Sequence, residues 1–253
     1  MAEDFYAELS ADYDRMIRWE RRLVRERPLF EVLWRRFHVN SVLDASCGTG
    51  HHLVLFRQMG LAVFGTDASH AMVKLARKTL EKAERARECT VLRSHWDKLP
   101  EVVERTFDAV LCIGNSLPYV TETEALHDSL RGLWSRVGEK GILLLQFKNF
   151  WKLRKENQRF LPLSWDPENP DSVAIRLYDY GEDRIDFNVI LLDRKREGWT
   201  MRHQVAPLRP YGAGDVTPLL ARLGAQVSAH GSLGLEDFDP DSSEDIVLLA
   251  RRE

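Results

Sequence analysis

Apolar and polar positions repeat with two different periods along the chain, and the change of period marks its organisation. Residues 3–38 carry apolar and aromatic side chains at helical spacing, which predicts two or three helices, one of them starting at Pro28. From residue 41 to residue 147, short apolar runs alternate with helical stretches. This alternation predicts an α/β fold with a doubly wound, mostly parallel sheet and helices on both of its faces.

The region from residue 41 to residue 147 contains five predicted strands with helices between them. Strands are predicted at residues 41–46, 61–67, 89–92, 107–113 and 141–147. Helices are predicted after the glycine-containing turn 47–50, over about 69–87 and over about 122–137. Strand and helix therefore follow one another as in successive βαβ units.

After Phe147 the pattern changes to period two. Prolines crowd a loop, and three stretches of alternating side chains follow at 173–180, 184–193 and 199–208, which predicts antiparallel strands. One face of the second stretch is apolar, so we expect this section to cover one side of the sheet. A helix at 214–223 and strands at 225–230 and 245–252 are predicted to complete the fold.

Composition and charge narrow the classes of function. The 253 residues are 44% hydrophobic and carry a formal net charge of -3, so no overall attraction to nucleic acid or to an anionic membrane is expected. The three cysteines show no C-x-x-C spacing, which favours a reducing cytoplasm and no structural metal. No apolar run approaches the roughly 18 residues of a membrane span.

The strongest local motif is the glycine-containing turn after the first predicted strand. Gly48 and Gly50 let the backbone approach a ligand closely, and the helix that follows offers free N–H groups. Asp67 ends the second predicted strand, where a carboxylate can accept hydrogen bonds from both hydroxyls of a ribose. Together they predict a nucleoside-binding site at the carboxyl edge of the sheet.

Two common nucleotide-binding motifs do not match this turn. A dinucleotide-binding turn would have a third glycine, but His51, His52 and Leu53 follow Gly50. A phosphate-binding P-loop would continue with Gly-Lys-Ser/Thr, which is also missing. The turn therefore favours a nucleoside with an amino acid tail over a pyrophosphate.

These residues resemble the class I S-adenosylmethionine-dependent methyltransferases, with a Rossmann-like methyltransferase fold. The family signature of an acid, a glycine-rich turn and a second acid matches Asp44, Gly48, Gly50 and Asp67, while Ser46 stands where the family has its first glycine. The resemblance implies S-adenosyl-L-methionine as cofactor and S-adenosyl-L-homocysteine as product. It is carried by residues 41–148.

The resemblance also implies a set of residues around the cofactor. Asp67 would bind the ribose, Met72, His95 and Trp96 would surround the adenine, and the turn would lie beside the methionine moiety. The full set is Tyr13, Arg21, Asp44, Ala45, Ser46, Gly48, Gly50, Asp67, Ala68, Met72, His95, Trp96 and Ile113.

On the acceptor side, residues 107–120 are similar to the fourth-strand region of glycine N-methyltransferases. Asn115 would face the substrate, and Lys148 would stand where those enzymes have a carboxylate-binding arginine, so that a point charge replaces a bidentate fork. Tyr13 and Arg21 would close over the cofactor, and Arg209 and Tyr211 would face the substrate. The implied catalytic set is Asn115, Tyr13, Lys148, Arg209 and Tyr211.

The resemblance divides the chain, residues 1–253, into parts of one methyltransferase domain. It implies a helical cap at 1–40, a cofactor-binding core at 41–148, an antiparallel substrate-side insertion at 149–211 and a helix with strands completing the sheet at 212–253. Two smaller domains stay possible. Monomer and homodimer are both open, and neither nucleic acid nor membrane is expected as a partner.

The favoured function is transfer of a methyl group to a small polar molecule with an amine or amino acid-like acceptor. No metal is required, because the sulfonium of the cofactor is already activated. A hydroxyl or carbon acceptor would need a base, for which His51, His52 and His127 are the candidates. Two alternatives remain: an RNA or protein methyltransferase, and a nonenzymatic S-adenosylmethionine-binding protein.

Overall fold

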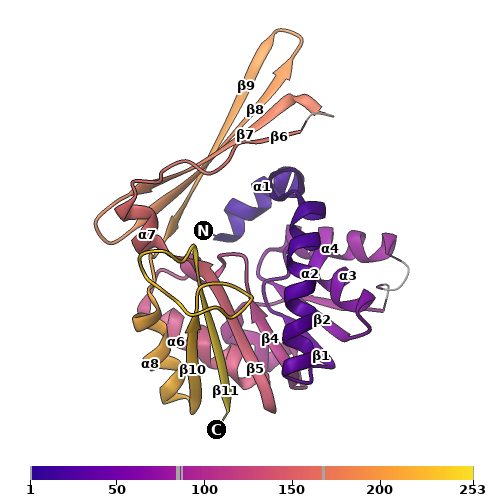
Figure 1. Ribbon diagram of the computed structural model, residues 1–253. Coiled ribbons are helices and arrows are strands. Elements are labelled where there is room, and N and C mark those ends of the chain that lie inside the picture. Colours follow the sequence, from indigo (N-terminus) through magenta and orange to yellow (C-terminus); the bar gives the residue numbers. More distant parts are fainter. Residues whose placement is uncertain (1, 84–85, 87, 167–168, 253) are drawn as a thin grey trace.

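A seven-stranded sheet forms the centre of the computed structural model, which describes residues 2–83, 86, 88–166 and 169–252 (Figure 1). Its strands are β1 (Ser41–Asp44), β2 (Ala62–Asp67), β3 (Thr90–Arg93), β4 (Phe107–Cys112), β5 (Val137–Lys148), β10 (Ala225–His230) and β11 (Asp245–Arg252). They lie in the order β10-β11-β5-β4-β1-β2-β3, with β1 to β5 parallel and β11 antiparallel to β5. The mostly parallel sheet is as the sequence predicted.

Helices cover both faces of this sheet, which confirms the doubly wound fold. One face packs against α2 (Trp19–Arg36), α3 (His51–Gln58) and α4 (His70–Lys82). The other face packs against α5 (Leu99–Val102), α6 (Thr123–Ser135) and α8 (Ala213–Arg222). The buried positions of α4 recur at helical spacing, and Ser69 begins the helix by accepting a hydrogen bond from the Met72 N–H.

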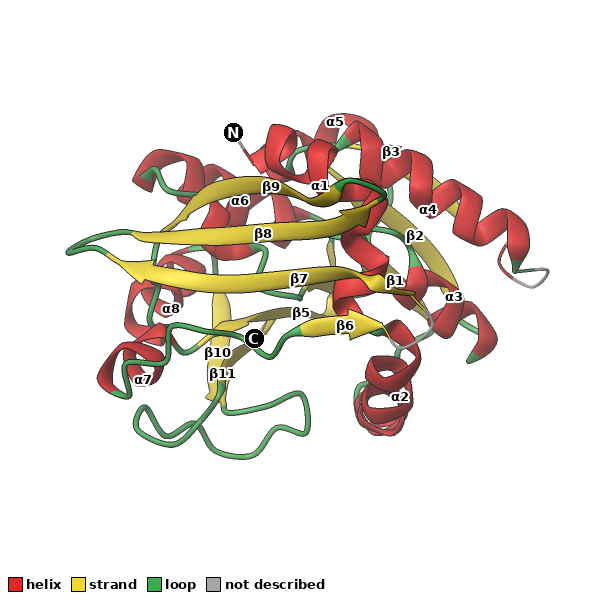
Figure 2. Ribbon diagram, turned by 90° about the horizontal axis from the view of Figure 1, so that it is seen from above, coloured by secondary structure: helices red, strands yellow, loops and turns green. Residues whose placement is uncertain are grey.

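A second, four-stranded antiparallel sheet lies above the carboxyl edge of the central sheet (Figures 1 and 2). Its strands are β6 (Ser164–Asp166), β7 (Asn169–Tyr180), β8 (Ile185–Lys195) and β9 (Gly198–Leu208), in that order. The sequence predicted that this section covers one side of the central sheet, and that prediction is wrong. Both faces are already occupied by helices, so the apolar face of β8 packs instead on the N-terminal helix α1 (Ala2–Ile17).

The N-terminal segment differs from its prediction in two ways. Pro28 lies inside α2 rather than at the start of a helix. Pro28 and Val24 are both exposed, so the carbonyl that the proline leaves without a partner faces water. Moreover, α2 buries Phe30 and Leu33 against the central sheet, whereas α1 extends over the carboxyl edge.

Some short elements had no sequence signal. α5, α7 (Phe150–Lys155) and β6 have four, six and three residues, fewer than a hydrophobic pattern needs to repeat. The helix predicted over about 69–87 ends at Lys82, and its predicted end at Arg87 lies outside the described residues. Of the helices that the structure describes, none is both long and apolar enough to cross a membrane.

Candidate active site

The turn between β1 and α3 has the backbone that its glycines predict. Gly48 has φ 53° and Gly50 has φ 84°, values in the left-handed region that favours glycine. A side chain at Gly50 would also meet the Ala76 Cα at 3.1 Å. The turn is therefore tied to glycine by backbone conformation and by its close approach to α4.

Asp67 lies at the end of β2, and its carboxylate is held by backbone N–H groups of the glycine turn and of the loop before α4. Its Oδ2 accepts a hydrogen bond from the Gly48 N–H and its Oδ1 accepts one from the Ser69 N–H, both at 2.9 Å. A carboxylate oxygen can accept more than one hydrogen bond. Asp67 therefore lies beside the glycine turn, and its role toward a ribose stays a prediction.

Asp44, at the end of β1, is a buried carboxylate, and only one of its oxygens accepts a hydrogen bond from the described residues. Oδ1 accepts from the Ser46 N–H at 3.2 Å, whereas Oδ2 is buried and has no hydrogen-bond partner among the described residues. The pKa of Asp44 is raised to about 7, chiefly by burial and also by the nearby Asp67, against the opposing effects of the Ser46 N–H and of Arg22. A buried acceptor of this kind fits a cation such as the amino group of a methionine tail.

Ser46 links the ends of two neighbouring strands. Its Oγ lies 3.2 Å from both the nitrogen and the oxygen of Ile113, accepting from the one and donating to the other. The serine thus makes contacts that a glycine could not make. The N–H and the carbonyl of Ile113, which the sequence predicted to support the cofactor, are thus both hydrogen-bonded to Ser46.

The three residues predicted around an adenine lie in different surroundings. Trp96 is half-buried and its Nε1 donates to the Ala45 carbonyl at 2.6 Å, so the indole braces the turn. Met72 is buried, and His95 is exposed. Ala68, next to Asp67, is half-buried.

Helix α1 is fastened over the glycine turn by two consecutive residues. The Tyr13 ring comes within 3.9 Å of the position that a Cβ on Gly48 would take. Asp14 accepts hydrogen bonds from Thr49 Oγ1 at 2.6 Å and from Trp19 Nε1 at 2.8 Å. Tyr13 therefore lies over the glycine turn, and its role toward the cofactor stays a prediction, whereas Asp14 gave no recognisable sequence signal.

The arginine at this site is Arg22, not the predicted Arg21. Arg21 is exposed, while the Arg22 guanidinium comes within 3.8 Å of the position of a Cβ on Gly114. Consecutive helix residues point about 100° apart, so an error of one residue turns the side chain away. Glu26 holds Arg22 through Oε1 at 2.9 Å, and its Oε2 lies 2.7 Å from His52 Nε2.

Asn115 and Lys148 lie together, but each is already engaged. Asn115 has a left-handed backbone with φ 68°, and its Oδ1 accepts from the Lys148 N–H at 2.9 Å. The Lys148 Nζ forms an ion pair with Asp245 at 2.8 Å. The carboxylate-binding role that the resemblance implied for Lys148 therefore conflicts with a charge that Asp245 already compensates.

Arg209 and Tyr211 brace a loop. Arg209 donates to the Thr121 carbonyl at 3.2 Å and to Thr123 Oγ1 at 2.9 Å. The Tyr211 hydroxyl donates to the Val120 carbonyl at 2.6 Å. Their polar groups thus hold the segment after residue 119, which differs from the substrate-facing role predicted for them.

An aromatic group that the sequence did not predict lies between α1 and the second sheet. Tyr6 stands 5.9 Å from Tyr13 and 5.3 Å from Tyr119, measured between ring centroids. Burial raises the pKa of all three phenols, so they are neutral at physiological pH. We call these three residues the tyrosine cluster. The seven-residue spacing of Tyr6 and Tyr13 on α1 was its only sequence signal.

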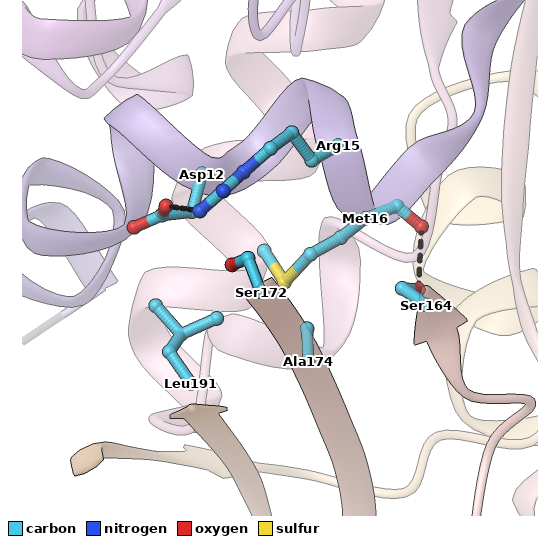
Figure 3. A pocket seen from close by; sticks show the side chains of 7 residues that line it. All are labelled: Asp12, Arg15, Met16, Ser164, Ser172, Ala174 and Leu191. Carbon is cyan, nitrogen blue, oxygen red and sulfur yellow. Dashed lines mark hydrogen bonds and ion pairs between the residues drawn. The ribbon is translucent and has the colours of Figure 1, made fainter. Parts of the chain in front are cut away.

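The contact between α1 and the second sheet leaves little space. A cavity of about 10 Å³ lies between them, room for one water at most. Figure 3 shows the side chains that line it. Asp12 pairs there with Arg15 and, at 2.8 Å, with Arg202 of β9, while Ser164 donates to the Met16 carbonyl at 3.0 Å. α1 is therefore packed closely under this sheet.

The sequence around this site is similar to that of known methyltransferases. Residues 42–141 match the family described as methyltransferase domain. The chain is 30% identical over 139 residues to a glycine/sarcosine N-methyltransferase of Aphanothece halophytica, a match that covers 54% of the chain and 51% of that protein. It is 30% identical over 131 residues to the human glycine N-methyltransferase, a match that covers 47% of the chain and 44% of that protein. The chain thus matches about half the length of these curated relatives.

Solved structures extend the likeness over the whole chain. An S-adenosylmethionine-dependent methyltransferase from Clostridium acetobutylicum aligns with TM-score 0.80 and 15% identity, covering 98% of both chains. The sugar N-methyltransferase KedS8 from a Streptoalloteichus species aligns with TM-score 0.67 and 23% identity, covering 100% of this chain and 93% of that one. At these identities the likeness concerns the fold, including the second sheet.

Proposed function

We propose that the chain is a class I, S-adenosylmethionine-dependent methyltransferase that transfers a methyl group to the nitrogen of a small amine, which the match of residues 42–141 to the methyltransferase domain family supports. The observation that carries the proposal is the pair of carboxylates on neighbouring strand ends. Asp44 and Asp67 flank the glycine turn under Tyr13, where one offers a buried acceptor and the other a fixed carboxylate.

The residues present fit S-adenosylmethionine, the cofactor expected of this family. Asp67 would bind the ribose hydroxyls, Asp44 the amino group of the methionine tail and Arg22 its carboxylate. Tyr13 would cover this end. When bound, the cofactor supplies an activated methyl group on a sulfonium, so the chain has to align the acceptor and exclude water.

The chemistry of the surrounding side chains favours an amine acceptor. The tyrosine cluster is neutral, so it can orient N–H bonds but does not supply a strong base. His52 is buried against Glu26, and burial lowers its pKa. His51 lies 3.3 Å from Asp14, and His127 is on α6, which covers a face of the sheet. An amine with a free lone pair needs no base for its attack.

The position of α1 favours a small acceptor over RNA or protein. α1 and the second sheet lie over the carboxyl edge, and their contact buries Phe5 and Leu9 (Figure 2). Residues 149–211 would then form the substrate-side roof, with Asn115 below it. The curated relatives are named for glycine and sarcosine, and a structural neighbour for a sugar, which supports a nitrogen acceptor.

The test is a panel of acceptors with a cofactor labelled in its methyl group. Glycine, sarcosine, an aminosugar, a short RNA and a lysine-containing peptide are compared by the label transferred. We expect transfer to at least one small amine, with the label on nitrogen. Transfer only to RNA or peptide would contradict the proposal.

A further inference from the structure

Arg176 is a positively charged residue of the second sheet, and it is not among the site residues described above. It lies on β7 between Ala174 and Tyr178, and alternation puts these three side chains on the same face. Ala174 and Tyr178 are buried, and Ala174 packs in the contact with α1. Arg176 therefore points to the side of the sheet that faces α1 and the candidate site.

The guanidinium of Arg176 is only partly satisfied. One terminal nitrogen donates to the Pro162 carbonyl at 3.3 Å, while Nε is buried and has no hydrogen-bond partner among the described residues. The guanidinium carries five N–H donors in a fixed fork that matches a carboxylate or a phosphate. A buried donor without a partner lowers stability unless a ligand completes it.

Its charge is also uncompensated. In the described part of the chain no carboxylate forms an ion pair with Arg176, whereas Glu26 pairs with Arg22 and Asp245 with Lys148. Burial lowers the pKa of Arg176, and the nearby guanidinium of Arg18 lowers it further, against the effect of the phenols of Tyr178 and Tyr13. A desolvated cation beside another cation attracts an anion strongly.

Tyr13 connects this cation to the cofactor end of the site. The Tyr13 ring packs on Gly48 of the glycine turn and also belongs to the apolar contact between α1 and the second sheet, which includes Ala174, two residues before Arg176 on the same face of β7. Arg176 thus lies on the roof side of Tyr13, and the turn lies below it. An anion bound by Arg176 would belong to a molecule next to the cofactor rather than to a distant surface.

We propose that Arg176 binds a carboxylate or phosphate of the methyl acceptor, so that the acceptor is an amine that carries an anionic group. This rests on the proposed function, since it names the acceptor class of that same site. The role that the resemblance gave to Lys148 would pass to an arginine on a different element, because Asp245 holds Lys148. Arg176 restores the bidentate fork that a lysine lacks.

The experiment measures binding to the protein saturated with S-adenosylhomocysteine. By calorimetry, sarcosine is compared with its amide, which lacks the carboxylate, and phosphoethanolamine with ethanolamine, which lacks the phosphate. The proteins are the wild type, Arg176→Met, Arg176→Lys and the control Arg194→Met. The control removes an arginine of the same sheet whose side chain is 65% exposed.

We expect each probe that carries the anionic group to bind the wild type at least tenfold more tightly than the counterpart that lacks it. Arg176→Met should remove this preference, Arg176→Lys should retain part of it, and the control should keep it whole. Tighter binding of sarcosine than of phosphoethanolamine identifies the anion as a carboxylate, and the reverse identifies a phosphate. Either result supports the proposal.

Three results would overturn it: no preference for either anion in the wild type, an unchanged preference in Arg176→Met, or an equal loss of S-adenosylhomocysteine affinity in that variant. The last would move Arg176 to the cofactor. Failure of the proposed function looks different, because S-adenosylhomocysteine would then not bind the wild type at all. Circular dichroism of each variant shows that it is folded.

Discussion

Burial brings the pKa of Asp44 close to neutrality, so the charge below the glycine turn changes in the pH range in which enzymes work. The pKa is raised from its unfolded value of 3.8 to about 7, so the folded protein binds the proton more tightly. Stability therefore falls as pH rises from about 4 to about 7. A bound cation beside the carboxylate would offset this loss.

We expect Asp44→Asn to remove the pH dependence that Asp44 creates. Between pH 5 and pH 8 the free energy of unfolding of the variant should gain about 2–3 kcal/mol relative to the wild type, because the amide carries no buried charge. Urea unfolding at both pH values measures this. In the wild type, S-adenosylmethionine should also bind more tightly as pH rises to about 7, a trend that the variant should lack. Parallel pH profiles would contradict this account of Asp44.

Asp67 should contribute directly to cofactor affinity. We expect Asp67→Ala to weaken S-adenosylhomocysteine binding roughly 10- to 100-fold, because a charge-assisted contact of about 1.5–3 kcal/mol disappears. Calorimetry measures the dissociation constant. Asp67→Asn retains an acceptor for the Gly48 N–H and separates the loss of charge from loosening of the turn. The exposed Asp128→Ala is the control, and equal affinities in all four proteins would refute the assignment.

At the scale of elements, the hold of α1 on the glycine turn depends on Asp14. The carboxylate joins α1 to the turn through Thr49 and to the start of α2 through Trp19. Burial alone would raise the pKa of Asp14, but the hydrogen bonds from His51 and Thr49 outweigh it and lower the pKa. Asp14 therefore stabilises the fold at pH values above its unfolded pKa, and this stabilisation is lost as pH falls through the lowered pKa of the folded state.

We expect Asp14→Ala to loosen α1 and raise the KM for S-adenosylmethionine about tenfold, the equivalent of one or two hydrogen bonds. The kcat should change less, because Asp14 does not face the acceptor. Steady-state kinetics give both values, and Glu20→Ala on the exposed side of α2 is the control. A KM equal to that of the control would show that α1 does not depend on this residue.

The sequence predicted the elements of the central sheet because their patterns are local. Alternating βαβ units and the turn with Gly48 and Gly50 are visible in short windows. Arg22 and Arg176 could not be found in this way. Arg22 depends on the phase of a helix to within one residue, and the importance of Arg176 comes from the missing carboxylate around it, which only the folded chain reveals.

At the scale of the whole molecule, two sheets enclose the candidate site with α1 between them (Figure 1). The central sheet presents the carboxylates of Asp44 and Asp67 at its carboxyl edge. The second sheet carries Arg176 on β7 and covers the tyrosine cluster. The position of this roof could not be predicted from strand alternation, which tells which face of β8 is apolar but not what that face packs against.

Thermal unfolding with and without ligand tests the central claim most directly, that the carboxyl edge binds S-adenosylmethionine. A ligand at one hundred times its dissociation constant adds about 2.7 kcal/mol, which for a chain of this size raises the Tm by roughly 5–10 °C. We predict such a rise with S-adenosylmethionine and S-adenosylhomocysteine, and none with adenosine monophosphate at the same concentration. An unchanged Tm with both sulfur compounds at millimolar concentration would contradict the account.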